Sequence, residues 1–300
     1  MKTVLVTGAN GFVGYYLVQH FLRSSYRVVA SGRSKEHSFP DHPHFNYYQF
    51  DFTDPLQVQQ VLKEVQPDVV VHSGAMSKPD DCEMNKELAL LTNVTGTANL
   101  LAEAKKCNSH FIFLSTDFVF SGERGMYSEE EQRSPVNYYG QTKVLAEDAV
   151  MQYPFQWSIV RTVLVYGRSA NGKLNFVEHV AAALRRNETL RIFHDQVRTL
   201  TYVEDLASGI VDIAERKAEG IYHLSGKDAM TVYEAACKVA QFIGQNDSQI
   251  QPIREGDLNA PAQRPKLTGF TITKAQKDLG YDPVSFETGL QKTFQSNVVS

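Results

Sequence analysis

The chain has 300 residues, of which 42% are hydrophobic and 21% are charged, and its formal net charge is −4. A chain of this length buries roughly three quarters of the surface that its unfolded form exposes, which suffices for one large domain or two modest ones. Charges of both signs are interspersed, so no nucleic-acid or membrane partner is expected.

The three cysteines, Cys82, Cys107 and Cys237, are far apart and form no metal-binding motif. Unpaired cysteines are typical of a reducing compartment, so a cytoplasmic location is expected. Glycines interrupt the apolar N-terminal stretch, and no segment is long and apolar enough to span a bilayer.

The first expected strand, KTVLVT, runs directly into TGANGFVG, which places Gly8, Gly11 and Gly14 in a strand-to-helix turn. In such a turn, free backbone N–H groups and the positive end of the helix dipole face an anion. Gly8 permits the tight turn, Gly11 lets the backbone approach the phosphates, and Gly14 lets the helix lie close to the strand. The motif predicts a dinucleotide site; the alternative is a merely structural turn.

The second expected strand, YRVVAS, is followed by Arg33 and Ser34. Sites that prefer NAD usually carry an acidic residue after this strand, where it holds the ribose 2′-hydroxyl. A guanidinium at this place would instead pair with a 2′-phosphate, and Ser34 could donate a further hydrogen bond. The sequence therefore favours NADP(H) over NAD(H), unless Arg33 is only a solvated arginine at a strand end.

Further strands are expected at 46–50, 68–72, 110–115 and 157–161, with amphipathic helices at 56–65 and 85–107 between them. This alternation is typical of βαβ units. It predicts an α/β fold in which helices cover both faces of a doubly wound parallel sheet, as in the Rossmann fold.

The strand at 110–115 runs into LSTDFVFSG, which puts Ser115, Thr116 and Asp117 at the carboxyl edge of the sheet, where parallel sheets bind their ligands. The Thr116 hydroxyl could hydrogen-bond a substrate carbonyl oxygen as negative charge develops there. The alternative is a threonine that merely ends a strand.

The segment NYYGQTK (137–143) is expected to begin a helix in which Tyr139 and Lys143 share a face and Tyr138 points elsewhere. A neighbouring ammonium is expected to lower the pKa of Tyr139 from its usual value of about 10, making the phenol a usable acid at neutral pH. The same spacing occurs in ordinary helices, and the glycine loop upstream is what favours chemistry here.

After Tyr166 the regular alternation ends, although a last strand at 220–225 is expected to return to the sheet. Residues 1–166 plus 199–225 are therefore expected to form the NAD(P)-binding Rossmann domain. A smaller, discontinuous C-terminal substrate-binding region is expected from residues 167–198 plus 226–300.

The glycine spacing resembles that of the extended short-chain dehydrogenase/reductases, and the likeness continues through Asp51, Phe52, HSGA (72–75) and Asn93. In that family the first two would lie against adenine, and Lys143 would also hold the nicotinamide ribose. The cofactor site implied by the resemblance consists of Gly8, Asn10, Gly11, Phe12, Val13, Gly14, Arg33, Ser34, Asp51, Phe52, Ser73, Gly74, Ala75, Ser77, Asn93, Ser115, Tyr139, Lys143 and Val163.

The stretch from Ser115 to Asp148 resembles dTDP-4-dehydrorhamnose reductases, as do RTVLVYG (161–167), DQ (195–196), YVEDLA (202–207) and RP (264–265). The resemblance implies catalysis by Thr116, Tyr139 and Lys143 on a keto-sugar carried by a nucleotide. The expected substrate contacts are Thr116, Asp117, Phe118, Asn175, Arg198 and Arg264. For the two arginines, a contact to the diphosphate and a structural ion pair are both open.

Three other functions share this fold. A nucleotide-sugar dehydratase is disfavoured, because Phe118 stands where such enzymes carry a glutamate that moves a proton. An epimerase could use the same tyrosine, and a regulatory subunit like the β subunit of methionine adenosyltransferase would keep the motifs without catalysis. Reductases of this group often form homodimers, and no metal is required.

Overall fold

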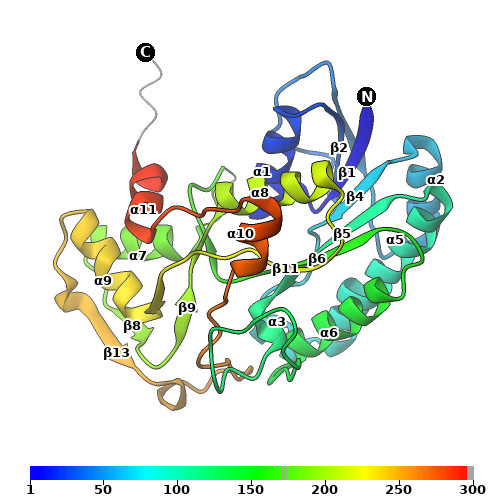
Figure 1. Ribbon diagram of the computed structural model, residues 1–300. Coiled ribbons are helices and arrows are strands. Elements are labelled where there is room, and N and C mark those ends of the chain that lie inside the picture. Colours follow the sequence, from blue (N-terminus) through cyan, green and yellow to red (C-terminus); the bar gives the residue numbers. More distant parts are fainter. Residues whose placement is uncertain (171, 173, 296–300) are drawn as a thin grey trace.

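A seven-stranded parallel sheet forms the centre of the molecule, in a computed structural model that describes residues 1–170, 172 and 174–295. The strand order is β11-β6-β5-β4-β1-β2-β3, so the chain extends the sheet in one direction from β1 and then in the other (Figure 1). The expected doubly wound Rossmann fold is confirmed, including the last strand. The strands are β1 (Lys2–Thr7), β2 (Tyr26–Gly32), β3 (Phe45–Gln49), β4 (Val69–His72), β5 (His110–Thr116), β6 (Trp157–Thr162) and β11 (Gly220–His223).

Helices cover both faces of this sheet. α1 and α8 pack on one face, and α2, α5 and α6 pack on the other (Figure 1). The helices of this part of the chain are α1 (Phe12–Leu22), α2 (Pro55–Val65), α3 (Pro79–Met84), α4 (Lys86–Leu90), α5 (Gly96–Ala104), α6 (Tyr138–Met151) and α8 (Val203–Arg216).

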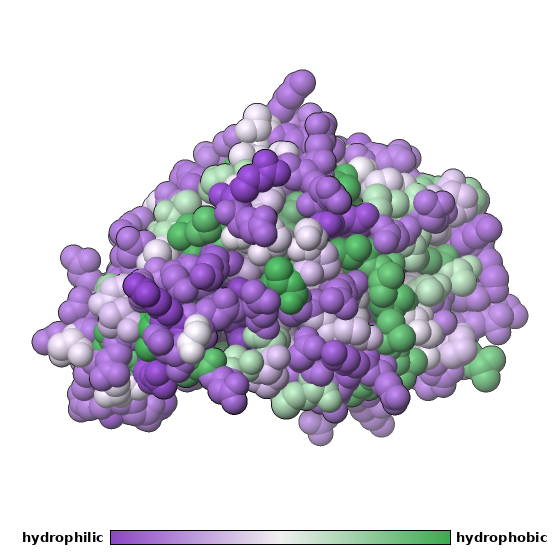
Figure 2. All heavy atoms as spheres, turned by 90° about the horizontal axis from the view of Figure 1, so that it is seen from below, coloured by the Kyte–Doolittle hydropathy of each residue, from purple (hydrophilic) through white to green (hydrophobic). Residues whose placement is uncertain are grey.

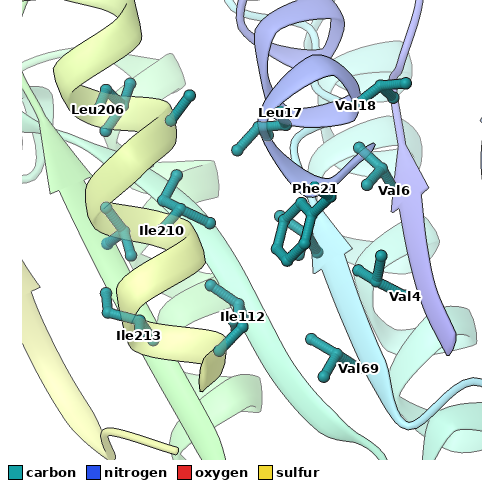
Figure 3. Close-up of a cluster of buried hydrophobic side chains, with 14 of the residues drawn as sticks. Val4, Val6, Leu17, Val18, Phe21, Val69, Ile112, Leu206, Ile210 and Ile213 are labelled. Carbon is teal, nitrogen blue, oxygen red and sulfur yellow. The ribbon is translucent and has the colours of Figure 1, made fainter. Parts of the chain in front are cut away.

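Alternate residues of β1 enter two separate cores. Val4 and Val6 pack with Phe21 of α1 and Ile210 of α8 (Figure 3). Leu5 points to the opposite face and packs among residues of α2, α5 and α6. A strand buried on both faces needs apolar residues at consecutive positions, which explains the unbroken run in VLV.

Side-chain caps fix where two of these helices begin. The Asp54 carboxylate accepts hydrogen bonds from the backbone N–H groups of Leu56 and Gln57, at 2.9 and 3.3 Å, at the start of α2. The Asn137 side chain accepts from the N–H of Gly140 at 2.9 Å, at the start of α6. Such caps satisfy N–H groups that have no partner within the helix.

The helix expected over 85–107 is not continuous. α4 passes into a π-helical segment, η1 (Leu91–Thr95), before α5 begins, and α5 ends in a 3₁₀ turn, η2 (Lys105–Cys107). Asn93 therefore lies in the π-helical segment. Such segments often occur next to functional sites, where they change the direction of a side chain.

The C-terminal part of the chain, as far as the structure describes it, has its own hydrophobic core between helices and three small two-stranded sheets. β7 pairs with β10, β8 with β13, and β9 with β12, and only the last of these three pairs is antiparallel. The elements are β7 (Val165–Tyr166), α7 (Phe176–Arg185), β8 (Leu190–Phe193), β9 (Val197–Thr199), β10 (Thr201–Tyr202), β12 (Ala229–Thr231), α9 (Val232–Phe242), β13 (Ile250–Ile253), α10 (Thr273–Leu279) and α11 (Phe286–Phe294), with short 3₁₀ turns η4 (Asp247–Gln249) and η5 (Glu255–Asp257). A further 3₁₀ turn, η3 (Asp117–Val119), follows β5 in the first part of the chain.

We propose the division anticipated above, with a Rossmann domain of 1–166 plus 199–225 and a substrate-binding region of 167–198 plus 226–300. Residues 171, 173 and 296–300 of that region lie outside the described residues. α10 belongs to the second region but packs against α8 and β11 of the Rossmann domain (Figure 1).

The surface is mostly hydrophilic, with apolar residues gathered in several groups on the face drawn in Figure 2. Exposed apolar side chains on α3, α4 and α6 include Met84, Leu88 and Leu145. The expected homodimer stays a prediction. Within the described residues, no helix has the length and apolarity needed to cross a membrane, and no three His, Cys, Asp or Glu side chains are grouped to hold a metal ion.

Candidate functional site

A cavity of about 1080 Å³ lies at the carboxyl ends of the sheet strands and extends toward the C-terminal region. Ligands of open α/β sheets bind at this edge. Most of the residues expected at the site line this cavity: Gly8, Asn10, Gly11, Phe12, Val13, Gly14, Arg33, Ser34, Asp51, Phe52, Ser73, Gly74, Ala75, Ser77, Ser115, Thr116, Asp117, Phe118, Tyr139, Lys143, Arg198 and Arg264.

The glycine loop leaves no room for side chains at two of its positions. A Cβ on Gly8, whose φ is +69°, would lie 2.6 Å from the Cα of Gly74, and one on Gly14 would lie 2.2 Å from the carbonyl oxygen of Gly8. Gly11 is the N-cap residue of α1. The loop therefore brings bare backbone and a helix N-terminus to the cavity, as anion binding requires.

The lining at the end of β2 contains Ser31, Gly32, Arg33 and Ser34, none of which is acidic. The Arg33 side chain is exposed. Asn10, from the glycine loop, reaches this region because its Nδ2 donates to the Tyr47 hydroxyl at 2.8 Å. A cationic group thus stands where the acid of an NAD-preferring site would be.

Phe52 is held between two glycines on neighbouring elements. A Cβ on Gly74 would lie 2.6 Å from its ring, and one on Gly96 would lie 2.5 Å from it. The adjacent Asp51 carboxylate accepts from the backbone N–H and the hydroxyl of Thr53, at 2.9 and 2.8 Å. Both residues are therefore fixed at the cavity wall after β3.

Asn93 supports the cavity without lining it. Its Oδ1 accepts from the N–H of Met76 at 2.8 Å, and its Nδ2 donates to the Met76 carbonyl and the Thr142 hydroxyl, both at 3.0 Å. The side chain is buried. Asn93 thus ties the loop after β4 to α6, which differs from the direct cofactor contact expected of it.

Tyr139 and Lys143 lie one turn apart on the buried side of α6, and Thr116 ends β5 beside them. The Lys143 Nζ donates to the Leu114 carbonyl at 2.7 Å and lies 3.9 Å from the centre of the Phe113 ring. The neighbouring Thr116 hydroxyl acts to lower the pKa of the Tyr139 phenol. Tyr138 is absent from the residues that line the cavity.

The expectation that Lys143 lowers the pKa of Tyr139 is wrong. Burial raises the pKa of the phenol, although the neighbouring Thr116 hydroxyl opposes this effect. Burial also lowers the pKa of Lys143 to about 7, against the attraction of Glu147. Desolvation outweighs the pairing that the sequence suggested, because both side chains are buried and the ammonium is directed at a backbone carbonyl.

A buried charge network lies beneath Lys143. The Glu147 carboxylate accepts from Arg161 at 2.8 and 2.9 Å, from the Ser115 hydroxyl at 2.6 Å and from Arg133 at 3.1 Å. Burial acts to raise the pKa of Glu147, but these partners outweigh it and hold that pKa below its usual value. Ser115 is thereby fixed next to Thr116, at the end of β5.

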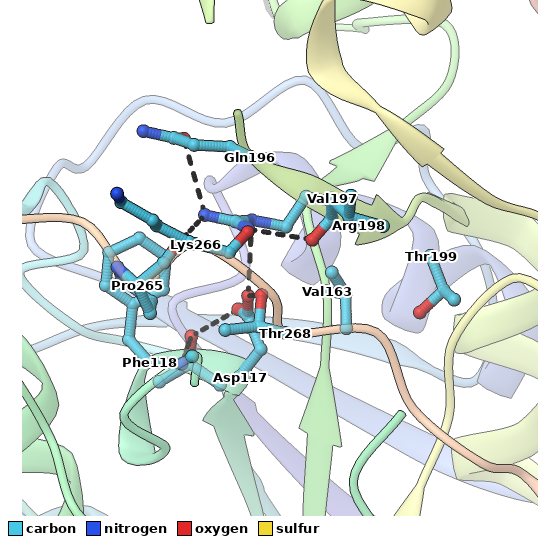
Figure 4. Close-up of polar contacts among 12 residues, drawn as sticks. Asp117, Phe118, Val163, Gln196, Val197, Arg198, Thr199, Pro265, Lys266 and Thr268 are labelled. Carbon is cyan, nitrogen blue, oxygen red and sulfur yellow. Dashed lines mark hydrogen bonds and ion pairs between the residues drawn. The ribbon is translucent and has the colours of Figure 1, made fainter. Parts of the chain in front are cut away.

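Arg198 forms a structural ion pair, the second of the two roles considered for it. Its Nε lies 3.6 Å from the Asp117 carboxylate, and its Nη1 and Nη2 donate to the carbonyls of Val197, Lys266 and Pro265 at 2.8, 2.8 and 2.6 Å (Figure 4). The side chain is buried. It therefore has little capacity left for a diphosphate.

Asp117 is engaged in the same network. Its carboxylate accepts from the hydroxyls of Thr116, at 3.1 Å, and Thr268. Burial raises its pKa, whereas Arg198 and the two hydroxyls act in the opposite direction. The network links η3, which follows β5, to the segment 265–268 near the end of the chain.

Besides Asn93, two expected site residues do not line the cavity, whereas Arg264 does. Val163 is fully buried, with its carbonyl bonded to the Thr201 hydroxyl at 2.6 Å. Asn175 precedes α7, and its Nδ2 donates to Gly167 at 2.6 Å. Arg264 lines the cavity while its Nη2 contacts Asp80 at 2.6 Å.

The cavity also has lining residues that motif reasoning did not identify. Apolar side chains on helices and small strands are indistinguishable from core residues in the sequence, so they gave no signal. Gln196 belongs to the DQ pair noted above, which was not assigned a place in the site. The additional lining residues are Ser31, Gly32, Phe50, Thr53, Pro79, Leu88, Leu91, Thr92, Leu114, Thr162, Leu164, Val165, Phe176, Phe193, Gln196 and Val232.

Comparison with known proteins finds a family and relatives that match nearly the whole chain. The family described as the RmlD substrate binding domain matches residues 1–299. The probable low-salt glycan biosynthesis reductase Agl14 of Haloferax volcanii is 31% identical, with 95% of each chain covered. The methionine adenosyltransferase 2 subunit beta of Mus musculus is 30% identical, over 97% of this chain and 87% of that protein.

A solved structure shares the fold closely. The dTDP-4-dehydrorhamnose reductase from Bacillus anthracis, in complex with NADP, superposes with a TM-score of 0.86 at 28% identity, covering 98% of this chain and 99% of that one. The fold, the glycine loop and the full-length match all indicate the same family. The chain therefore belongs to the RmlD substrate binding domain family, within the extended short-chain dehydrogenase/reductases.

Proposed function

We propose that this protein is an NADPH-dependent reductase of a keto-sugar carried on a nucleotide. The observation that carries the proposal is that one cavity brings the glycine loop together with Thr116, Tyr139 and Lys143. The relatives named as reductases, and the NADP bound in the Bacillus anthracis structure, support the reaction type and the cofactor.

The residues present fit NADP(H). The glycine loop presents bare backbone next to the N-terminus of α1, because neighbouring backbone atoms exclude a Cβ at Gly8 and at Gly14. Arg33 and Ser34 stand at the end of β2, where a guanidinium and a hydroxyl suit a 2′-phosphate. Asp51 and Phe52 form the wall proposed to receive adenine.

NADPH, when bound, would supply a hydride to the carbonyl carbon of the sugar. Tyr139 would then give its proton to the carbonyl oxygen, so that the carbonyl becomes a hydroxyl. Its raised pKa keeps the phenol protonated at neutral pH, so the proton is present before the reaction. The Thr116 hydroxyl, which donates to Asp117 in the free protein, would turn its O–H toward the carbonyl oxygen and stabilise the negative charge that develops there.

Lys143 is proposed to hold the nicotinamide ribose. Its ammonium is anchored to the Leu114 carbonyl at 2.7 Å, at the wall of the cavity. A pKa of about 7 means that Lys143 loses its charge near neutral pH unless a bound group with acceptor oxygens stabilises the ammonium.

For the nucleotide-sugar, Phe118 and Arg264 are the proposed contacts at the cavity wall. Arg264 is the candidate for the diphosphate, because its side chain is partly exposed and its ion pair with Asp80 lies at the surface. Asp117 is proposed to position Thr116 rather than to touch the sugar, since its carboxylate is occupied by Arg198 and Thr268.

The other functions are distinguished by what each would require. A dehydratase needs an acid and a base at this edge, but Phe118 carries no proton and Asp117 is buried in an ion pair. An epimerase would return the hydride to the sugar and consume no NADPH. The full-length likeness to methionine adenosyltransferase 2 subunit beta favours a regulatory role as the second candidate.

The proposal is tested by measuring NADPH oxidation with a panel of nucleotide-linked 4-keto sugars. Stoichiometric oxidation with at least one sugar is expected. NADPH binding without oxidation across the panel would contradict a reductase and favour the regulatory role, and sugar interconversion without net oxidation would identify an epimerase.

NADPH is expected to bind at least several-fold more tightly than NADH, and Arg33→Ala should remove most of this preference. The reason is that a guanidinium contributes charge-assisted hydrogen bonds only when the 2′-phosphate is present. Dissociation constants for both nucleotides, measured by fluorescence titration, give the ratio. The matched control is Arg27→Ala, because Arg27 is an exposed arginine on β2, the strand before Arg33, and does not line the cavity. Equal affinities of the unaltered protein for the two nucleotides would refute this cofactor preference.

A further inference from the structure

The side chain of Gln196 is buried at the cavity wall with half of its amide unsatisfied. It is 4% exposed and lines the cavity. Among residues 1–170, 172 and 174–295, its Nε2 has no hydrogen-bond partner. An unpaired buried donor is costly in a folded protein, so it calls for a partner that the protein chain does not provide.

Arg198 determines which way this amide points. The Arg198 Nη2 donates to the Gln196 Oε1 at 3.4 Å, and in Figure 4 the nitrogen end of the amide points away from the guanidinium. Exchanging the oxygen and nitrogen of the amide would set two N–H donors against each other. The backbone is held as well, because the Gln196 carbonyl accepts from the N–H of Val232 at 2.9 Å.

The same guanidinium connects Gln196 to the reacting end of the cavity. Its Nε pairs with Asp117 at 3.6 Å, and the other oxygen of that carboxylate accepts from the Thr116 hydroxyl at 3.1 Å. The backbone carbonyls of residues 265 and 266 fix the guanidinium from the opposite side. The amide is therefore held in place relative to Thr116 through Arg198 and Asp117.

From this geometry we infer that Gln196 Nε2 donates a hydrogen bond to an oxygen of the sugar in the nucleotide-linked substrate, and that Arg198 is a positioning residue for this amide. The inference rests on the proposed function and names a specificity contact within it. A neutral amide suits a hydroxyl or ring oxygen, whereas a diphosphate favours cationic, bidentate donors. A site built this way discriminates against sugars that lack the matching oxygen.

Binding measurements with NADP⁺ present test this contact, because the oxidised cofactor cannot reduce the sugar. The probes are the nucleotide-linked sugar that binds best from a panel including dTDP-4-dehydrorhamnose, and the corresponding nucleoside diphosphate alone. The variants are Gln196→Met, which removes the amide at similar length, and Gln196→Glu, which keeps an acceptor for Arg198 but has no donor when ionised. Gln241→Met, at an exposed position on α9, is the control.

Both Gln196 variants are expected to bind the nucleotide-linked sugar roughly three- to tenfold more weakly, as the loss of one neutral hydrogen bond predicts. Binding of the nucleoside diphosphate and of NADP⁺ should stay unchanged, as should all affinities of Gln241→Met. Melting temperatures measured alongside show whether each variant is folded.

Three results would overturn the inference. Unchanged sugar affinity in both variants would show that Gln196 makes no contact, and recovery of normal affinity in Gln196→Glu would show that only the bond to Arg198 matters. Failure of the unaltered protein to bind any nucleotide-linked sugar would show that the proposed ligand of Gln196 is wrong. A protein that binds the sugar but does not oxidise NADPH contradicts only the proposed reductase, because the comparison of affinities still decides the role of Gln196.

Discussion

Replacing Tyr139 by phenylalanine is expected to lower turnover about 100- to 10,000-fold, the usual contribution of a positioned general acid. The substitution removes one hydroxyl and keeps the ring, which packs edge-on against Phe118 with 5.7 Å between ring centres. The apparent affinity for NADPH should therefore change little. The measurement is steady-state turnover with a keto-sugar that the unaltered protein reduces.

The neighbouring tyrosine provides the matched control. Tyr138 begins the same helix, but its backbone N–H donates to Glu83 and its ring lies 5.3 Å from the Lys86 ammonium, away from the residues lining the cavity. Tyr138→Phe should lose much less activity. Near-normal turnover of Tyr139→Phe, or an equal loss in both variants, would mean that Tyr139 is not the proton donor.

Replacing Glu147 by alanine is expected to destabilise the fold by about 3–5 kcal/mol, because it leaves the guanidinium of Arg161 buried without its carboxylate. Both side chains are almost completely buried, 0% and 1% exposed, and they share two hydrogen bonds. The free energy of unfolding in urea gives the loss. When one partner of a buried ion pair is removed, the remaining charge stays out of reach of water and is not stabilised by it.

Asp148→Ala is the control for this experiment. Asp148 follows Glu147 in α6 and contacts Arg133 at 2.7 Å, but its side chain is 51% exposed. Water and salt screen such a pair, so a loss of no more than about 1 kcal/mol is expected. If the two variants were equally stable, Glu147 would not be the centre of the buried network.

The site residues that directly follow a strand of the sheet could be predicted from the sequence. The glycine loop depends on local backbone geometry: a Cβ on Gly14 is excluded by the loop's own residues Gly8 and Ala9, and one on Gly8 by the backbone of Gly74, which follows the neighbouring strand β4. Arg33, Ser34, Asp51 and Phe52 follow strand ends, so the order of strands was sufficient to place them at the cavity.

The roles of other residues depend on partners far along the chain. Arg198 was open between two roles because its acceptors, Asp117 and the carbonyls at 265 and 266, come from segments that the sequence does not bring together. Asn93 resembled a cofactor contact, but Met76 and Thr142 occupy its amide. Tertiary hydrogen bonds of this kind leave no periodic signal in a sequence.

The pKa of Tyr139 shows a different limit. Spacing along α6 correctly placed Tyr139 and Lys143 on one face of the helix, but it carried no information on burial. In the folded protein, desolvation acts on both groups and changes the sign of the expected shift for the phenol. The residues were found from the sequence, and their electrostatics required the packing around them.

Transfer of deuterium from NADPH to sugar tests the central proposal most directly. The protein would be supplied with NADPH labelled at C4 of the nicotinamide, in each of its two stereoisomers, together with a nucleotide-linked 4-keto sugar. The proposed reaction predicts that one isomer places deuterium on the new carbinol carbon, and that Tyr139→Phe slows this transfer to the same extent as turnover. Tight binding of labelled NADPH with no deuterium in any sugar of the panel would contradict the proposed function.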